Sequence, residues 1–144
     1  MSADGQALLL DTHVWVWLVE GDRKRFARRI ESPVEAAAAR GELWIAAISV
    51  WELAMLDARR RLELSQDVRT WVARALAFPG VRLKTLSPSI AIESTRLPGT
   101  LHGDPADRLL IATARLTGSA IVTCDERILA YAKERHVRAV DARR

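Results

Sequence analysis

The chain has 144 residues, of which 49% are hydrophobic and 28% charged, with a net charge of +4. This length is typical of one domain with a substantial core, so we expect a single domain over residues 1–144 with flexible ends at 1–6 and 141–144. The short apolar runs exclude a membrane span, the acidic N-terminus does not resemble a secretory signal, and the one cysteine, Cys124, excludes an internal disulfide, so we expect a cytoplasmic protein.

Short apolar runs alternate with helical patterns along the whole chain. In the first half we expect a strand at 6–10, a helix broken at Gly21-Asp22, a helix from Ser32-Pro33 to Arg40, a strand at 43–48, and helices at 49–61 and 65–77. In the second half we expect a strand at 81–86, a helix opened by Ser87-Pro88, a helix from Asp104-Pro105 to Gly118, a strand at 119–123, a helix at 126–135 and a strand at 137–140. The alternation predicts an α/β fold with a mostly parallel sheet.

Four acidic residues follow these strands or begin the helices after them. They are Asp11, Glu52, Asp107 and Asp125. Because the carboxyl ends of parallel strands share one edge of a sheet, we expect these carboxylates to converge there. Clustered carboxylates repel one another, and a hard divalent cation is the usual partner that makes such a cluster tolerable. The pattern therefore predicts a metal-dependent active site.

Helix capping is the competing explanation for each acid taken singly. Ser49 and Glu52 have the spacing of a capping box, Asp104 precedes a proline at the first helical position, and Asp125 precedes a helix. Capping does not require acids after the first, second and fourth strands, so the combination favours a site. Thr12, Ser49 and Thr123 add hydroxyls suited to orient the carboxylates, as groups behind metal ligands do.

Other chemistries lack their usual residues. The sequence has no glycine-rich phosphate loop, no G-x-S-x-G motif and no paired cysteines for zinc. Cys124 lies beside Asp125, which disfavours a reactive thiolate. His13 and His102 could flank the site, but a structural or surface role is the favoured interpretation for both.

Four segments resemble the signature blocks of PIN-domain ribonucleases and, more narrowly, of VapC toxins from type II toxin–antitoxin systems. The blocks are Leu8–Trp15, Ile48–Leu53, His102–Ala114 and Val122–Ile128. They cover most of the chain in the expected order. The resemblance implies a three-layer α/β/α domain with four or five mostly parallel strands.

The resemblance also implies an activity, which is Mg²⁺- or Mn²⁺-dependent endoribonucleolytic cleavage of cellular RNA. The family's metal-binding catalytic acids fall on Asp11, Glu52, Asp107 and Asp125, Asp104 is an auxiliary acid, and Thr123 supports the site. Two clusters of arginines are candidate contacts to the RNA backbone, although each cluster could equally form the solvated face of a helix. The candidates are Arg23, Arg25, Arg28, Arg59 and Arg60.

The implied partners are RNA, a VapB-like antitoxin and a second copy of the chain. The apolar residues Trp51, Leu53 and Met55, together with Trp71, are candidates for the dimer surface, although a place in the core explains them equally well. Two alternative functions stay open. One is a metal-dependent DNA nuclease or other phosphoesterase with the same acids, and the other is a non-catalytic binding module in which the acids cap helices or dock a basic peptide.

Overall fold

A computed structural model describes residues 5–101 and 103–144 of the chain. Within these ranges, five parallel strands form one sheet in the order β3-β2-β1-β4-β5. The strands are β1 (Leu8–Leu10), β2 (Leu43–Ala46), β3 (Val81–Lys84), β4 (Ala120–Thr123) and β5 (Arg138–Asp141). The central strand β1 pairs with β2 on one side and with β4 on the other. The predicted parallel α/β sheet is confirmed.

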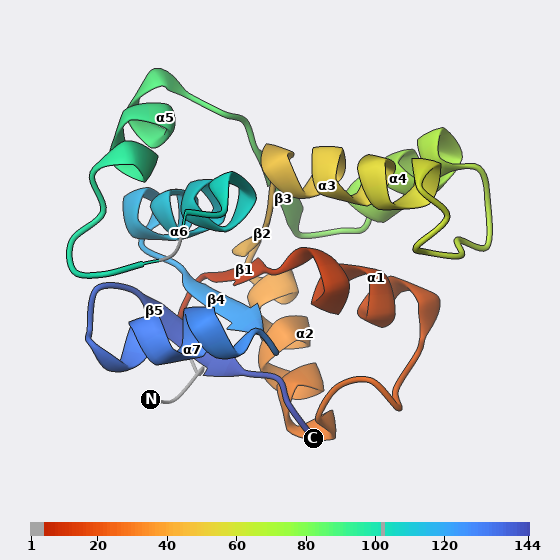
Figure 1. Cartoon of the computed structure of the whole chain (residues 1–144). Helices are drawn as coiled ribbons and strands as arrows, with labels where there is room; N and C mark the ends of the chain where they lie inside the picture. The colour runs from red at the N-terminus through yellow and green to blue at the C-terminus, as the bar shows by residue number, and fades with distance from the viewer. Residues whose placement is uncertain (1–4, 102) are drawn as a thin grey trace.

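Helices connect successive strands and cover both faces of the sheet (Figure 1). The helices are α1 (Thr12–Glu20), the 3₁₀ turn η1 (Arg28–Ile30), α2 (Glu31–Ala39), α3 (Ala47–Ala58), α4 (Val68–Leu76), α5 (Pro88–Thr95), α6 (Pro105–Thr117) and α7 (Glu126–Lys133). In the view of Figure 1, α5, α6 and α7 lie to the left of the central strands and α1 and α2 to the right. This arrangement is the expected α/β/α layering.

Alternate residues of the strands divide the core into two clusters. On β1, Leu8 and Leu10 pack with side chains of α1, α2 and α4, whereas Leu9 packs with those of α5, α6 and α7. Strand side chains point alternately to opposite faces, which is why a run of consecutive leucines can serve both clusters. All three leucines are fully or almost fully buried. The acid that follows them therefore stands at the end of the buried central strand of the sheet.

Two helices begin earlier than the sequence pattern predicts. Helix α3 begins at Ala47 and its N-cap is Ala46, so the strand before it ends two residues before the predicted end at residue 48. Helix α2 begins at Glu31, directly after η1, and Ser32 is not its cap. In both places residues with no side-chain cap begin the helix, because the chain turns straight out of a strand or a 3₁₀ turn.

The candidate dimer residues separate into core and surface. Leu53 and Trp71 are buried in the first core cluster, and Trp71 packs edge-on against Trp15, so assigning these two to a dimer surface was wrong. Trp51, on the opposite face of α3, has 56% of its surface exposed and Met55 is half-buried. Only Trp51 among the four offers a large exposed apolar surface.

The C-terminal residues pack against the domain in place of the flexible end that we expected at 141–144. Ala142 is fully buried, its N–H donates to the carbonyl of Thr123, and its carbonyl accepts from the N–H of Ala27. At the other end, residues 1–4 lie outside the described part of the chain, and the carbonyl of Gln6 accepts from Arg40 at 2.8 Å. Among the described residues, no helix has the length and apolar character that crossing a membrane requires.

Candidate metal centre

Asp11 stands directly after β1 and is the N-cap of α1. Its Oδ1 accepts a hydrogen bond of 2.7 Å from the N–H of Thr12, and its Oδ2 accepts one of 2.6 Å from the hydroxyl of Thr123. Thr123 is the last residue of β4, which neighbours β1 in the sheet. The expected support from Thr123 is thus a direct contact, whereas Thr12 contributes through its backbone N–H.

Asp125 lies two residues beyond β4 and is the N-cap of α7. Its Oδ1 accepts from the N–H groups of Arg127 and Ile128 at 2.8 and 3.0 Å, and its own N–H donates to the hydroxyl of Thr123 at 2.9 Å. Thr123 therefore holds both the carboxylate of Asp11 and the backbone of Asp125. The carboxylate of Asp125 caps its helix and still lies among the other acids, so capping and a site role are compatible here.

Helix α6 carries the third acid of the motif. Asp104 is its N-cap, with Oδ1 accepting from the N–H of Asp107 at 3.1 Å, which confirms the predicted cap. Asp104 is exposed and Asp107 is half-buried. Asp107 thus points from the first turn of α6, where the free N–H groups and the helix dipole favour a negative charge.

Glu52 has no capping role in the structure. Because α3 begins at Ala47, Glu52 lies in the second turn of the helix and cannot reach the N-cap, so the capping box predicted for Ser49 and Glu52 is absent. Helix α3 contacts both α1 and α6, and Glu52 is half-buried. The hydroxyl of Ser49 is buried and has no hydrogen-bond partner among the described residues. Helix capping therefore does not explain the presence of Glu52.

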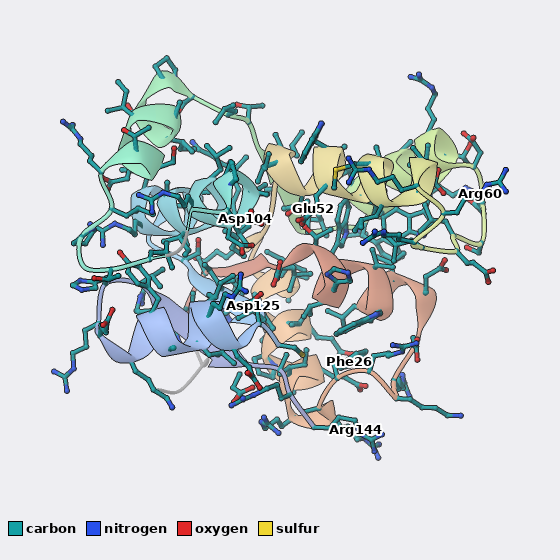
Figure 2. The ribbon with its side chains drawn as sticks, viewed as in Figure 1. Phe26, Glu52, Arg60, Asp104, Asp125 and Arg144 are labelled. Carbon is teal, nitrogen blue, oxygen red and sulfur yellow. The ribbon has the colours of Figure 1, made fainter. Side chains whose placement is uncertain are left out.

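The negative charges act strongly on one another. Burial, together with the charges of Asp104, Asp125, Asp11 and Glu52, raises the pKa of Asp107 to about 7. Burial also raises the pKa of Asp11, although the hydrogen bonds from Thr123 and Thr12 act in the opposite direction. Figure 2 shows Glu52, Asp104 and Asp125 in the middle of the molecule, between α3, α6 and α7. All the predicted acids are therefore brought together at one edge of the sheet.

The donor set suits a hard divalent cation. Every candidate ligand is a carboxylate, and oxygen donors of this kind favour Mg²⁺ or Mn²⁺ over zinc. In the described ranges, no group of three or more histidine, cysteine or acidic side chains is arranged so that it could hold a metal ion. Burial and the neighbouring like charges together raise the pKa of Asp107, and a divalent ion would relieve the repulsion between these charges.

His13 and Cys124 lie at the margin of the site. His13 is exposed, its ring centroid lies 5.8 Å from that of Trp17, and its charge lowers the pKa of Asp11. His102 lies outside the described residues. Cys124 is half-buried, and its pKa is raised by burial and by Asp141 and Asp11, as expected for a thiol that is not a nucleophile.

Sequence reasoning missed Asp141 as a neighbour of the site. It ends β5 and pairs in register with Thr123 of β4, so it is an acid at the carboxyl end of a strand like the others. Its carboxylate is neutralised by Arg143 at 2.7 Å, and the hydrogen bond from this arginine lowers its pKa. The sequence places an acid directly after the strand predicted at 137–140, but the prediction assigned residue 141 to a flexible end.

The predicted RNA-contact arginines lie in two segments of the chain, one before and within η1 and one at the C-terminal end of α3. Arg23 pairs with Glu31 at 3.4 Å and Arg25 with Asp22 at 3.5 Å, and Arg28 is exposed nearby. Arg59 and Arg60 are exposed at the C-terminal end of α3, and Figure 2 shows Arg60 far from Asp104 and Asp125. Arg25 lines a pocket together with His13, the second residue after Asp11.

Comparison with known proteins places this arrangement in a family. The model of the PIN domain matches residues 8–134, which include Asp11, Glu52, Asp104, Asp107 and Asp125. The chain belongs to the PIN-domain family. A PIN-domain relative, Ribonuclease VapC22 of Mycobacterium tuberculosis (strain ATCC 25618 / H37Rv), is 37% identical over 133 residues, which are 92% of this chain and 95% of the relative.

Solved structures share the PIN fold at lower identity. VapBC2 from Rickettsia felis, bound to a DNA fragment from its promoter, has a TM-score of 0.67 at 13% identity and covers 94% of this chain and 98% of its own. DNA-bound VapBC from Salmonella typhimurium has a TM-score of 0.63 at 17% identity, with the same coverage. FitAcB from Neisseria gonorrhoeae has a TM-score of 0.62 at 19% identity and covers 93% and 96%.

Proposed function

We propose that this PIN-domain protein is a Mg²⁺- or Mn²⁺-dependent endoribonuclease and the toxin of a type II toxin–antitoxin pair. The single observation that carries the proposal is the gathering of the motif acids around Asp107, where burial first, and then the charges of Asp104, Asp125, Asp11 and Glu52, raise the pKa of Asp107 to about 7. A bound divalent cation would neutralise the repulsion between these carboxylates. The 37% identity to a ribonuclease over most of the chain supports RNA as the substrate.

Each residue of the cluster has a role in this proposal. Asp11, Asp107, Asp125 and Glu52 hold the cation, directly or through water. When bound, the cation lowers the pKa of a water molecule and neutralises charge on the scissile phosphate. Thr123 positions the carboxylate of Asp11, and Asp104 caps α6 so that Asp107 faces the other acids. Hydrolysis by this route leaves 5′-phosphate and 3′-hydroxyl ends.

The proposed partners are a VapB-like antitoxin and a second copy of the chain, in the cytoplasm. The solved structures of similar fold include toxin–antitoxin complexes, which supports an antitoxin partner. Trp51 is the residue that we assign to self-association, because more than half of its surface is exposed on α3.

Total cellular RNA, incubated with the purified protein, tests the proposed activity. We expect discrete fragments with 5′-phosphate ends in the presence of Mg²⁺, no fragments in EDTA, and none from Asp107→Asn. Matched DNA oligonucleotides in the same buffer serve as the comparison, and faster cleavage of DNA would replace the ribonuclease with a DNA nuclease. Well-folded protein that is free of antitoxin and cleaves neither substrate would favour the binding module.

A further inference from the structure

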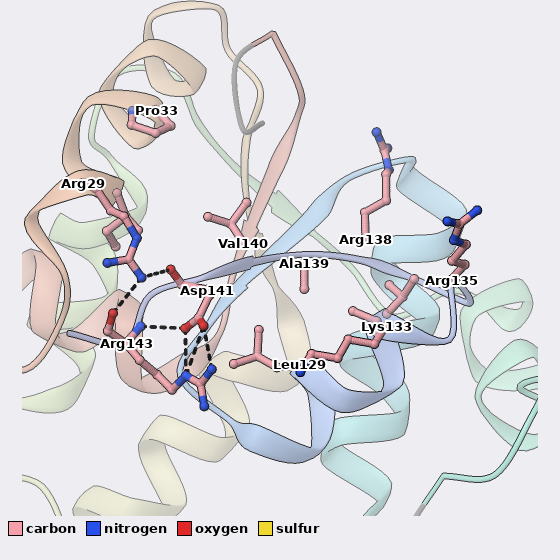
Figure 3. A pocket seen from close by; sticks show the side chains of 13 residues that line it. Arg29, Pro33, Leu129, Lys133, Arg135, Arg138, Ala139, Val140, Asp141 and Arg143 are labelled. Carbon is pink, nitrogen blue, oxygen red and sulfur yellow. Dashed lines mark hydrogen bonds and ion pairs between the residues drawn. The ribbon is translucent and has the colours of Figure 1, made fainter. Parts of the chain in front are cut away.

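A groove of about 750 Å³ runs along β5 on the outer edge of the sheet (Figure 3). One wall comes from α7 and the turn after it, and the other from η1 and the start of α2. Its floor is β5 itself, an edge strand that pairs only with β4 among the described strands. The groove is distinct from the acidic cluster, and the arginines that were predicted from the sequence do not line it.

The charged side chains that line the groove are almost all basic. They are Arg29, Lys133, Arg135, Arg138 and Arg143, with Asp141 as the one acid among the lining residues. Asp141 is paired with Arg143 at 2.7 Å, so it offers no uncompensated negative charge. The groove therefore presents a strong positive field to any molecule that enters it.

The remaining cations are not neutralised by acids. Arg29 donates to the carbonyls of Asp141 and Arg143 at 3.0 and 2.7 Å, and Arg138 donates to the carbonyl of Gly118 and to the side-chain oxygen of Gln6. These acceptors are neutral, so they orient the guanidinium groups without cancelling their charge. Lys133 and Arg135 are exposed and form no ion pair within the described part of the chain.

One end of the groove adjoins the acidic cluster. Asp141 is in register with Thr123, one strand spacing or about 4.8 Å away, and Thr123 holds Asp11. Asp141 and Asp11 are both close enough to Cys124 to raise the pKa of its thiol. From this end β5 runs back to Arg138, a span of about 10 Å of extended chain, and Lys133 and Arg135 line the groove beyond it.

We propose that this groove binds the phosphodiester backbone of the RNA substrate as the strand leaves the acidic cluster along β5. The proposal rests on the proposed ribonuclease function and adds a binding path to it. A phosphodiester strand is favoured over an acidic peptide because the groove continues into a site built for phosphate chemistry.

Lys133 and Arg135 are the residues to change, because they line the groove without holding β5 in place. The double variant Lys133→Gln/Arg135→Gln is made in the Asp107→Asn background, so that RNA is bound without being cut. Arg69→Gln/Arg74→Gln, two exposed arginines of α4 outside the groove, is the charge-matched control. Fluorescence anisotropy with a 20-nucleotide single-stranded RNA gives the dissociation constant over a range of salt concentrations.

For single strands, each phosphate contact contributes about 0.7 to the slope of log Kd against log salt, so the groove variant should lose about 1.4 from this slope. The control should keep the slope of the parent. Equal slopes for the groove variant and the parent, with both proteins folded by circular dichroism, would overturn the proposal. Groove-dependent binding of poly-glutamate or of single-stranded DNA, but not of RNA, would overturn it as well.

Kinetics with the active protein separates this proposal from the proposed function. Lys133→Gln/Arg135→Gln should raise KM for a 20-nucleotide RNA more than for a four-nucleotide RNA that covers only the acidic cluster. An equal rise for both lengths would argue against a path along β5. Failure of the unmodified protein to cleave any RNA would remove the ribonuclease function, whereas the salt slopes in the Asp107→Asn background would still decide whether the groove binds RNA.

Discussion

The hydroxyl of Thr123 donates a hydrogen bond of 2.6 Å to the carboxylate of Asp11, although 112 positions separate the two residues in the chain. The parallel pairing of β1 with β4 creates this contact, because Leu10 and Val122 are in register and the next residues face each other at the carboxyl edge. The bond opposes the effect of burial on the pKa of Asp11. It also fixes the direction in which the carboxylate points.

Thr123→Val should reduce cleavage by about 10- to 100-fold while the fold is retained, because groups behind metal ligands contribute on this scale. Valine has a similar volume but cannot donate to Asp11 or accept from the N–H of Asp125. Thr123→Ser keeps the hydroxyl and should restore most of the activity. Single-turnover cleavage rates of the two variants make the comparison, and equal rates would show that the hydroxyl has no part in the reaction.

The stability of the metal-free protein should fall as the pH rises from about 4 to about 7. The pKa of Asp107 is about 7 in the folded protein against 3.8 for an ordinary aspartate, so the folded state binds more protons between these values and loses this advantage as the pH rises. Since Asp107 is only half-buried, solvent screens the effect, and we expect about 1 kcal/mol. Thermal melts in EDTA measure it.

Asp107→Asn supplies the control for that pH dependence. The amide cannot ionise, so at pH 8 the metal-free variant should melt roughly 3 °C above the unmodified protein. At pH 4 the two proteins should melt at similar temperatures, because the carboxyl is protonated there in the folded state. A variant that is less stable at both pH values would mean that Asp107 contributes a packing or capping interaction of its own.

Mg²⁺ should raise the melting temperature in a manner that depends on the acids. At a concentration 100 times the dissociation constant, a ligand that binds only the folded state adds about 2.7 kcal/mol, or roughly 5–10 °C for a domain of this size. Asp11→Asn and Asp107→Asn should lose most of this rise. Differential scanning fluorimetry with Mg²⁺, Mn²⁺ and Ca²⁺ provides the measurement, and an undiminished rise in both variants would place the cation elsewhere.

Ser49→Ala tests a buried hydroxyl that has no partner among the described residues. An unpaired buried polar group lowers stability, so its removal should raise the free energy of unfolding by about 1 kcal/mol. Urea denaturation is the direct measurement. A loss of stability would indicate that the hydroxyl has a hydrogen bond in solution, and a simultaneous loss of activity would assign it the supporting role that the sequence suggested.

Leu53→Ala and Trp51→Ala should behave in opposite ways, although the two residues are two positions apart on α3. Leu53 is fully buried, so its truncation should lower the free energy of unfolding by about 2–5 kcal/mol. Trp51 has 56% of its surface exposed, so its truncation should leave stability within about 0.5 kcal/mol but weaken self-association. Urea melts and sedimentation velocity test the two effects, and an unchanged oligomeric state in Trp51→Ala would exclude that surface.

The sheet and the acids were predictable because both depend on local patterns. Leu8 to Leu10 form a buried strand that alternates between two core clusters, and an acid directly after such a strand must lie at the carboxyl edge. Asp104 was predictable as a cap because a proline at the next position fits the first turn of a helix. In each case a few adjacent residues determine the local structure, either the end of a strand or the start of a helix.

The remaining features depend on contacts between distant segments. The pattern around Ser49 and Glu52 is that of a capping box, but β2 leads into α3 without a capping residue and begins the helix two residues earlier. The basic groove brings Arg29 together with β5 and the end of α7, residues more than a hundred positions apart. The periodicity of the sequence does not indicate such a contact between distant segments. The prediction therefore named arginines that cluster in the sequence and missed the cations of the groove.

The position of β1 in the middle of the sheet determines when the acidic cluster can form during synthesis. One side of β1 pairs with β2, but the other side waits for β4, which the ribosome makes more than a hundred residues later. Until then Asp11 lacks its contact with Thr123, and Asp107 and Asp125 have not yet emerged. A growing chain therefore lacks the complete acidic cluster until nearly the whole domain has been synthesised and folded.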